Sequence, residues 1–420
     1  MESERLSRNI IAIIIVAALG YFVDIYDLVL FAIVRVESLK AIGIAGKGLT
    51  DTGILLMDAQ MIGLLCGGLL WGVLGDKRGR LSVLFGSIFL YSVANILNAF
   101  VQNVPQYAIL RFIAGVGLAG ELGAGITLIA EVMPKEHRGY GATIVATVGL
   151  LGAILAGYIG NNYDFRTCYV IGGVMGVILL LLRIGVTESN MFKKIHQHNT
   201  VQKGSIRLLF SNKDRVKRYI TCILIGLPIW YAVGILVTLS PEFGHFMEIQ
   251  GEVKTGTAIM YTYSGLALGD LICGLLSQFL KSRKKAVLLY MLLSVLTIAW
   301  FLTLRGVSSD AFYWMYFVIG LCAGYWAIFV TIASEQFGTN LRATVTTSVP
   351  NFVRGAVVPI TLLFNLFRNT LQYDLVLSAL GVAIVVFALS LWALSQMRET
   401  FGIDLNYLEG NDSALTVDKK

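Results

Sequence analysis

The sequence predicts an all-α membrane protein whose twelve transmembrane helices form two repeated halves. Three observations lead to this fold class. The chain of 420 residues is 56% hydrophobic and only 14% charged, whereas a soluble domain carries about 25% charged residues. Apolar segments of about 20 residues, long enough to cross a bilayer as a helix, recur along the whole chain. Finally, loop motifs of the first half return in the second half in the same order.

The apolar segments are expected to form twelve helices, the first of which follows the polar start MESERLSRN. This first segment is longer than the apolar part of a signal peptide and lacks a small-residue cleavage site after it, so we expect it to be retained. The expected helices comprise residues 10–34, 51–74, 81–101, 106–131, 139–161, 167–186, 219–241, 255–280, 285–304, 311–334, 343–366 and 375–397.

The lysines and arginines between these helices predict the orientation in the membrane. The termini and the loops on their side hold 24 of the 33 basic residues when Arg183 is counted with its loop. Since basic loops stay in the cytoplasm, we expect both termini there, and the bias suits a bacterial inner membrane. The net charge of +7 therefore reflects topology and does not indicate nucleic-acid binding.

The longest expected loop, residues 187–218, is polar and basic and separates six helices from six helices. It divides the chain into a first six-helix unit at 1–186, the cytoplasmic connecting loop itself, a second six-helix unit at 219–397 and a cytoplasmic tail at 398–420. Each of these boundaries is a prediction from the loop positions.

The two six-helix units carry the same loop motifs at a nearly constant distance. Residues 72–84, GVLGDKRGRLSVL, follow the second helix, and residues 274–289 follow the eighth helix 202 positions later. A glutamate and an arginine seven residues apart follow the fourth helix at 131–138, and the same pair follows the tenth helix at 335–342, an offset of 204. Motifs that recur in the same order at a nearly constant offset indicate a duplicated six-helix unit.

Residues 72–80, GVLGDKRGR, resemble the signature G-x-L-x-D-R-x-G-R of the loop after the second helix in the major facilitator superfamily. Residues 111–121, RFIAGVGLAGE, look like the fourth-helix motif of its sugar-porter and metabolite:proton symporter branches, and RETFGIDL resembles another of their signatures. The resemblance covers the whole chain. It implies two pseudo-symmetric six-helix bundles around a central cavity, which opens to alternate sides of the membrane as the bundles rock.

The resemblance also implies a gate of charge pairs between helices at the cytoplasmic side, with salt bridges that are present in one state and broken in the other. In the second copy of the loop motif, Gln278 and Lys281 replace the aspartate and a glycine, so the first copy is the stronger candidate. We expect Asp58 to act in structure or gating, and Asp270 to pair with basic residues of the gate. The candidate gating residues are Gly72, Asp76, Arg78, Gly79, Arg80, Glu131, Arg138, Glu335 and Arg342.

Two aspartates of the first helix, Asp24 and Asp27 in YFVDIYDLVLF, are the main candidates for chemistry inside the membrane. A carboxylate at this depth costs roughly 2.5 kcal/mol or more. Their i, i+3 spacing places both on one helix face, which we therefore expect to line the cavity. The other charges that we expect deep in the membrane are Arg111, Glu121 and Arg354.

Counting ~1.5 Å per residue suggests how these charges pair. Asp27 and Arg111 lie ~10 Å and ~8 Å from the outer ends of their helices, and Asp24 and Arg354 meet near the midplane at ~15 Å and ~18 Å. Proton-coupled sugar porters also place an aspartate of the first helix near an arginine of the fourth. That match fits Arg111 together with either aspartate.

The same charges predict proton coupling. A carboxylate in dry surroundings favours its protonated form, and a nearby guanidinium favours the ionised form, so movement of the arginine would switch proton affinity. Arginine itself stays charged. The proton therefore belongs to Asp24 or Asp27, with Glu121 as the rival site and Arg111 as the switching charge.

The isolated guanidinium of Arg354, close to Asn351 in sequence, predicts binding of an anion such as a carboxylate. The seventh helix shows no glutamine pair of the kind expected for a hexose site. Aromatic residues are expected to form polar-tipped walls around the substrate. The candidates are Tyr26, Trp230, Tyr231, Tyr261, Tyr263, Tyr325 and Trp326.

These features predict a secondary transporter that takes up a small organic anion or related metabolite by proton symport. The alternative is a proton antiporter that exports drug-like or siderophore-like compounds; it is disfavoured because the fifth helix lacks the proline of a G-x-x-x-G-P-x-x-G-G run. No nucleotide-binding loop or catalytic triad is apparent in the sequence, and the five cysteines lack metal-binding spacing, so no enzyme, cofactor or metal site is predicted. We expect a monomer in the lipid bilayer, with the small molecule and protons as its partners.

Overall fold

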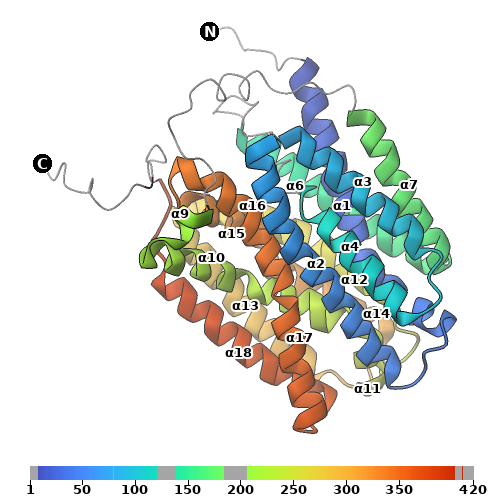
Figure 1. Cartoon of the computed structure of the whole chain (residues 1–420). Coiled ribbons are helices and arrows are strands. Elements are labelled where there is room, and N and C mark those ends of the chain that lie inside the picture. Colours follow the sequence, from blue (N-terminus) through green and yellow to red (C-terminus); the bar gives the residue numbers. More distant parts are fainter. Residues whose placement is uncertain (1–7, 79, 122–137, 184–205, 403–408, 410–420) are drawn as a thin grey trace, which may run out of the picture.

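The computed structural model describes residues 8–78, 80–121, 138–183, 206–402 and 409, and nearly all of them are helical. The first half contains α1 (Arg8–Ala41), α2 (Gly48–Arg78), α3 (Arg80–Asn98), α4 (Val104–Leu118), α6 (Arg138–Asn162) and α7 (Phe165–Arg183). The second half contains α9 (Ile206–Phe210), α10 (Lys213–Tyr231), η1 (Ala232–Val237), α11 (Ser240–Phe246), α12 (Thr255–Phe279), α13 (Arg283–Thr303), α14 (Ser309–Ala323), α15 (Trp326–Glu335), α16 (Thr339–Gly355), α17 (Val357–Asn365), η2 (Leu366–Thr370) and α18 (Leu375–Gln396). The long helices run side by side (Figure 1). We call the end at which α1 begins the terminal face, and the other end the opposite face.

The helices have the length and composition of membrane spans. Within the described residues, nine helical segments are long and apolar enough to cross a membrane, and three shorter apolar helices cover Val83–Asn98, Val104–Leu118 and Val148–Asn162. Large apolar side chains cover the outside, among them Phe279 at 84% exposure. Such a surface indicates contact with lipid. The predicted membrane fold of twelve helices is confirmed.

Polar side chains cap the N-terminal ends of several helices. The Asn103 side chain accepts a hydrogen bond from the N–H of Gln106 at 3.0 Å at the start of α4. The Asp374 carboxylate accepts one from the N–H of Leu377 at 2.7 Å at the start of α18. These contacts satisfy backbone donors that have no partner within the helix, and they end the loops between neighbouring spans.

Three of the expected spans are interrupted. The seventh continues from α10 into the π-helical η1, the tenth breaks between α14 and α15, and the eleventh is divided into α16, α17 and the π-helical η2. In the tenth, a Cβ on Gly324 would come within 2.6 Å of the Gly269 backbone, and the Asp270 carboxylate accepts a hydrogen bond from the N–H of Ala327 at 3.1 Å. Asp270 therefore caps α15, and among the described residues it forms no ion pair with a basic residue of the gate, contrary to the expectation.

The two halves use the same internal contacts. α2 packs against α4 in the first half as α12 packs against α14 in the second. A Cβ on Gly63 or Gly115 would overlap the facing backbone in the first half, and one on Gly265 or Gly320 would do so in the second. Small residues permit this close approach of membrane helices. Between the halves, α2 contacts α16 and α6 contacts α12, which relates the bundles by a pseudo-twofold axis.

Candidate functional site

A cavity lies between the two halves. The space between its walls, including its opening to solvent, amounts to about 320 Å³. Side chains from α1 and α6 of the first half face side chains from α10, η1, α12, α15 and α16 of the second. The lining residues are Tyr21, Ile25, Leu150, Ile229, Trp230, Val233, Tyr263, Leu266, Trp326 and Arg354.

Arg354 of α16 is the charged residue of this lining. Its side chain is 1% exposed, and its guanidinium lies 5.9 Å from the centre of the Trp326 ring. Nη1 of Arg354 donates to Oδ2 of Asp24 in α1 at 3.4 Å, so the ion pair joins the two halves. This pairing agrees with the depths counted from the sequence. Nε of Arg354 and Oδ1 of Asp24 have no hydrogen-bond partner among the described residues.

Asp27 lies one turn further along α1 and points into the first half. Its Oδ1 lies against Gly172 of α7, and neither carboxylate oxygen has a hydrogen-bond partner in the described ranges. Arg111 of α4 is the main positive charge acting on Asp27, while Nη2 of Arg111 donates to Gln60 of α2. The expectation that both aspartates face the cavity is therefore corrected: Asp24 reaches it through Arg354, and Asp27 does not.

Glu121, the rival proton site, forms a buried ion pair with Arg183 at the end of α7. Nη1 of Arg183 donates to Oε2 at 3.2 Å, and Nη2 donates to Oε1. The pair packs on Gly20 of α1, one turn before Asp24. Sequence position suggested that Arg183 is a loop charge. Its burial, which the sequence does not reveal, makes it the partner of Glu121.

Three of the aromatic candidates line the cavity, namely Trp230, Tyr263 and Trp326. Tyr21 and Ile25 of α1 also line it and were not predicted. Their spacing of four residues places both on the α1 face toward the second half. The cavity therefore has aromatic walls from both halves around one guanidinium.

The other predicted substrate residues have different contacts. The hydroxyls of Tyr26, Tyr231 and Tyr325 donate to backbone carbonyls of other helices at 3.0, 2.9 and 3.0 Å. Tyr261 stacks on a tyrosine of α14, with ring centres 5.7 Å apart. The Asn351 amide donates at 2.9 Å to a carbonyl just beyond α4, across the interface between the halves. We therefore leave these five residues out of the proposed substrate site.

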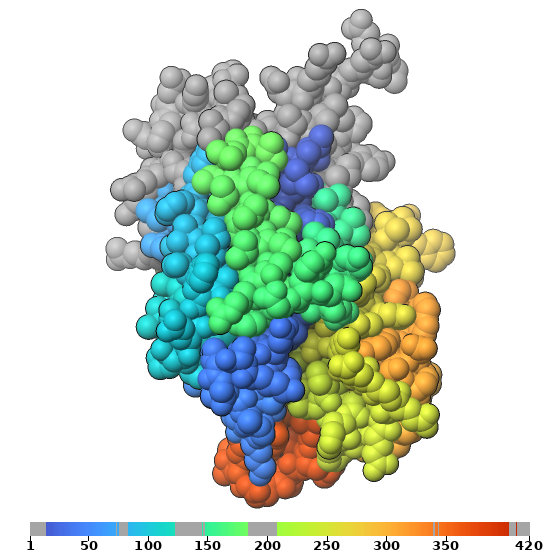
Figure 2. Space-filling view, turned by 90° about the vertical axis from the view of Figure 1, so that its right-hand side faces the viewer, coloured from blue at the N-terminus to red at the C-terminus, as the bar shows by residue number. Residues whose placement is uncertain are grey.

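A second set of polar contacts joins the halves near the opposite face, where Figure 2 shows the end of α1 packed against the second half. Nη2 of the buried Arg35 in α1 donates to both carboxylate oxygens of Glu242 in α11, at 2.6 and 2.8 Å. Thr50 of α2 donates to the same carboxylate at 3.2 Å. Thr361 of α17 donates to Asp58 of α2 at 2.7 Å, which supports the expected role of Asp58 in structure or gating. We call these five residues the latch.

Glu242→Gln is expected to open the opposite face. Loss of a charge-assisted hydrogen bond costs about 1.5–3 kcal/mol, and about 1.4 kcal/mol changes a population tenfold. In a cysteine-free background, a Val233→Cys probe in the cavity wall should then react about tenfold faster or more with an impermeant maleimide added at the opposite face. Glu252→Gln, which loosens an exposed ion pair to Lys254, is the matched control. Equal labelling of the Glu242 variant and this control would contradict the latch.

The predicted gating residues of the second half lie at the terminal face. Glu335 pairs with Arg283 at 3.5 Å, and Arg342 donates to the carbonyl of Ser334 at 3.1 Å. Glu399 accepts hydrogen bonds from the N–H groups of residues 283 and 400, both at 2.9 Å, and from a serine hydroxyl. Partial burial opposes the charge of Glu399, but these hydrogen bonds outweigh it and lower the pKa of that carboxyl below its ordinary value.

The first copy of the gate motif lies at the end of α2 and the start of α3. Gly79 and Glu131 lie outside the described residues, and of Asp76, Arg78, Arg80 and Arg138 the backbone alone is described. Gly72 lies within α2. The pairing of these charges therefore stays a prediction.

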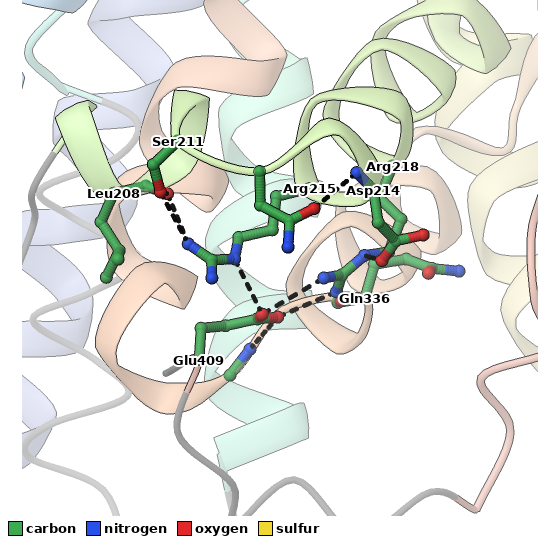
Figure 3. Close-up of polar contacts among 9 residues, drawn as sticks. Leu208, Ser211, Asp214, Arg215, Arg218, Gln336 and Glu409 are labelled. Carbon is green, nitrogen blue, oxygen red and sulfur yellow. Dashed lines mark hydrogen bonds and ion pairs between the residues drawn. The ribbon is translucent and has the colours of Figure 1, made fainter. Parts of the chain in front are cut away.

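The tail contributes an unpredicted contact at the terminal face. Figure 3 shows the Glu409 carboxylate between Arg215 and Arg218 at the start of α10. Arg218 donates to it at 2.8 and 3.2 Å, and Nε of Arg215 lies 3.4 Å away. The N–H of Gly338, which precedes α16, is 3.4 Å from the same carboxylate. Glu409 thus connects the beginnings of two helices in the second half.

Comparison with known proteins places this chain among transport proteins. The sequence model of the Major Facilitator Superfamily matches residues 12–360. A Haemophilus influenzae protein provisionally described as a metabolite transport protein is 31% identical over 349 residues, which are 78% of this chain and 82% of that protein. The 3-(3-hydroxy-phenyl)propionate transporter of Escherichia coli is 27% identical, with 75% and 79% covered, and the gentisate transporter of Corynebacterium glutamicum is 24% identical, with 90% and 86% covered.

A solved structure agrees with the fold. The crystal structure of a D-xylose-proton symporter superposes with a TM-score of 0.71, covering 94% of this chain and 100% of that chain. The sequences are 16% identical. At this sequence identity, the structural similarity supports the arrangement of the helices but gives no information about the substrate.

Proposed function

The chain belongs to the Major Facilitator Superfamily and is a membrane transporter, and on this premise we propose that it takes up an aromatic carboxylate by symport with protons. The observation that carries the proposal is the buried ion pair of Arg354 and Asp24 at the central cavity. A guanidinium with a free Nε matches the geometry of a carboxylate. The aromatic walls suit a flat ring beside it.

The same pair supplies the coupling between substrate and proton. When the substrate carboxylate binds Arg354, it displaces Asp24, whose carboxylate then lies buried without its counter-charge. A carboxylate in that position takes up a proton. The loaded protein thus contains the anion together with one proton, and both are released after the two halves have opened to the other side of the membrane.

The relatives support the class of substrate. The two named transporters, for 3-(3-hydroxy-phenyl)propionate and for gentisate, carry substrates with a benzene ring and a carboxyl group. Arg354 and the aromatic lining of this cavity have the chemistry to bind such a molecule. We extend the substrate class to this chain on that basis.

The orientation follows from the charges of the loops. In the sequence, lysines and arginines concentrate in the termini and in the loops expected on their side, and the positive-inside rule favours the cytoplasm for that side. The proposed setting is therefore a bacterial inner membrane with both termini inside and with the latch on the outer side. A monomer contains both halves of the cavity, and we keep the monomer as a prediction.

The direction of coupling is tested in proteoliposomes with an imposed pH gradient, with labelled gentisate and 3-(3-hydroxyphenyl)propionate as probes. We expect accumulation when the outside is acidic, because symport then carries protons down their gradient. An uncoupler should abolish the accumulation, and protein-free liposomes provide the background. Accumulation with an acidic interior would instead identify a proton antiporter, the exporter alternative, and would overturn the proposal of symport.

A further inference from the structure

A stripe of polar side chains runs along one buried face of α3. Four of its members, Ser87, Tyr91, Asn95 and Asn98, are spaced by three or four residues, as one helix face requires, and Ser92 adjoins this face. None of the five is more than 1% exposed. α3 packs against α4 and α7, so the stripe lies inside the first half. We call Ser87, Tyr91, Ser92, Asn95 and Asn98 the α3 stripe.

Many polar atoms along the α3 stripe lack a protein partner. Within the part of the chain that the structure describes, no hydrogen bond reaches the Tyr91 hydroxyl, the Ser92 hydroxyl or either amide atom of Asn95 and Asn98. The Asp27 carboxylate belongs to the same set. Buried polar atoms in native proteins nearly always bond to protein or to ordered water. Their concentration at one place points to a hydrated interior beside α3.

The helix opposite the stripe leaves space for it. A Cβ on Gly172 of α7 would overlap Oδ1 of Asp27, and one on Gly176 would overlap the Ser92 hydroxyl. Two successive turns of α7 therefore present only hydrogen toward these oxygens. Larger side chains at these two positions would displace the polar groups of α1 and α3.

The stripe lies near two of the three carboxylates that the sequence marked as proton sites, Asp27 and Glu121. Asn95 lies beside the Asp27 carboxylate. Along α7, Gly172 faces the Asp27 carboxylate, and Gly176 one turn later faces the Tyr91 ring and the Ser92 hydroxyl. Arg183 at the end of the same helix pairs with Glu121, so the Tyr91 ring lies between Asp27 and this ion pair. Arg111 faces the Asp27 end of the same interior. Three carboxylates thus follow one another along α1.

We propose that the α3 stripe is a proton route inside the first half, separate from the substrate cavity. The inference rests on the proposed function, since it requires proton coupling. A proton leaves Asp27, the Tyr91 hydroxyl or an adjoining water accepts it and gives up another, and Glu121 receives that proton and loosens its pair with Arg183. The net step moves one proton from Asp27 to Glu121 and leaves Tyr91 neutral. No residue that lines the cavity belongs to the stripe.

Tyr91→Phe and Asn95→Leu test the route. Proton-driven uptake of gentisate should fall by about tenfold or more, as loss of a proton-transferring group typically does. Counterflow, the exchange of labelled for unlabelled gentisate without a gradient, should be retained because it needs no net proton movement. It also shows that the variants fold. Tyr316→Phe removes a buried hydroxyl that donates to a carbonyl at 2.9 Å in the second half, and serves as the matched control.

The outcomes separate this inference from the proposed function. A wild-type protein that accumulates gentisate under an acid-outside gradient, with both α3 variants equal to it, would overturn the proton route and leave symport intact. If the wild-type protein does not accumulate gentisate in response to the pH gradient, both the proton route and the proposed symport are overturned. Uptake of protons, followed with a pH-sensitive dye inside the vesicles, should fall in parallel with accumulation in the two variants and remain unchanged in Tyr316→Phe.

Discussion

Arg354→Ala is expected to weaken binding of an aromatic carboxylate by at least about 30-fold and to abolish its accumulation. Truncating one partner of a buried charge pair costs about 2–5 kcal/mol, and each 1.4 kcal/mol is a factor of ten in affinity. The substrate would lose its only proposed counter-charge while still entering a cavity with largely apolar and aromatic walls. Binding of labelled gentisate to the purified protein, measured beside wild type, checks the expected loss.

Two further variants separate substrate binding from damage to the fold. Arg354→Ala alone leaves Asp24 buried without its partner, so the double variant with Asp24→Asn removes that unpaired charge as well. We expect the double variant to recover thermal stability but not binding. Arg354→Lys keeps the charge and loses the planar fork, and should bind more weakly than wild type but better than alanine. Binding at the wild-type level by Arg354→Ala would exclude Arg354 from the site.

The sequence was sufficient to pair Asp24 with Arg354, because a helix rises by a constant ~1.5 Å per residue and position along a span therefore gives depth. It was not sufficient to show where Asp27 points. The rotation of α1 about its axis is set by packing against α6 and α7. The sequence of α1 alone does not specify these contacts. The two aspartates consequently have different partners although they lie one turn apart.

The latch was missed for a related reason. The first helix was expected to end at 34, which left Arg35 as a loop charge, whereas α1 continues to Ala41 and buries Arg35 completely. Its partner Glu242 lies 207 residues away in α11, just beyond the expected seventh span. Long-range partners on short elements leave no periodic signal in the sequence. The hydrogen bonds from the Tyr231 and Tyr325 hydroxyls to backbone carbonyls were not predicted for the same reason. A backbone carbonyl can accept a hydrogen bond anywhere along a helix, so its position leaves no signal in the sequence.

Asp24→Asn is expected to remove the pH dependence of substrate binding while binding itself remains strong. In wild type the ionised Asp24 occupies Arg354, and protonation of Asp24 removes this competitor. One linked proton changes the dissociation constant by up to about tenfold per pH unit, with weaker binding as the pH rises through the range where Asp24 ionises. Asparagine is neutral at every pH, so the variant should show the low-pH wild-type affinity throughout. Titration of gentisate binding against pH measures the slope.

The same variant should lose accumulation driven by a pH gradient but keep counterflow, since the anion binds and crosses without bringing a proton. Asp58→Asn is the matched control, because Asp58 is also a partly buried carboxylate but contacts Thr361 of the latch and does not line the cavity. It should retain the wild-type slope. If Asp24→Asn also retained that slope and Asp27→Asn lost it, the proton that governs binding would reside on Asp27. Substrate and Asp24 would then not compete for Arg354, and coupling would have to arise within the first half alone.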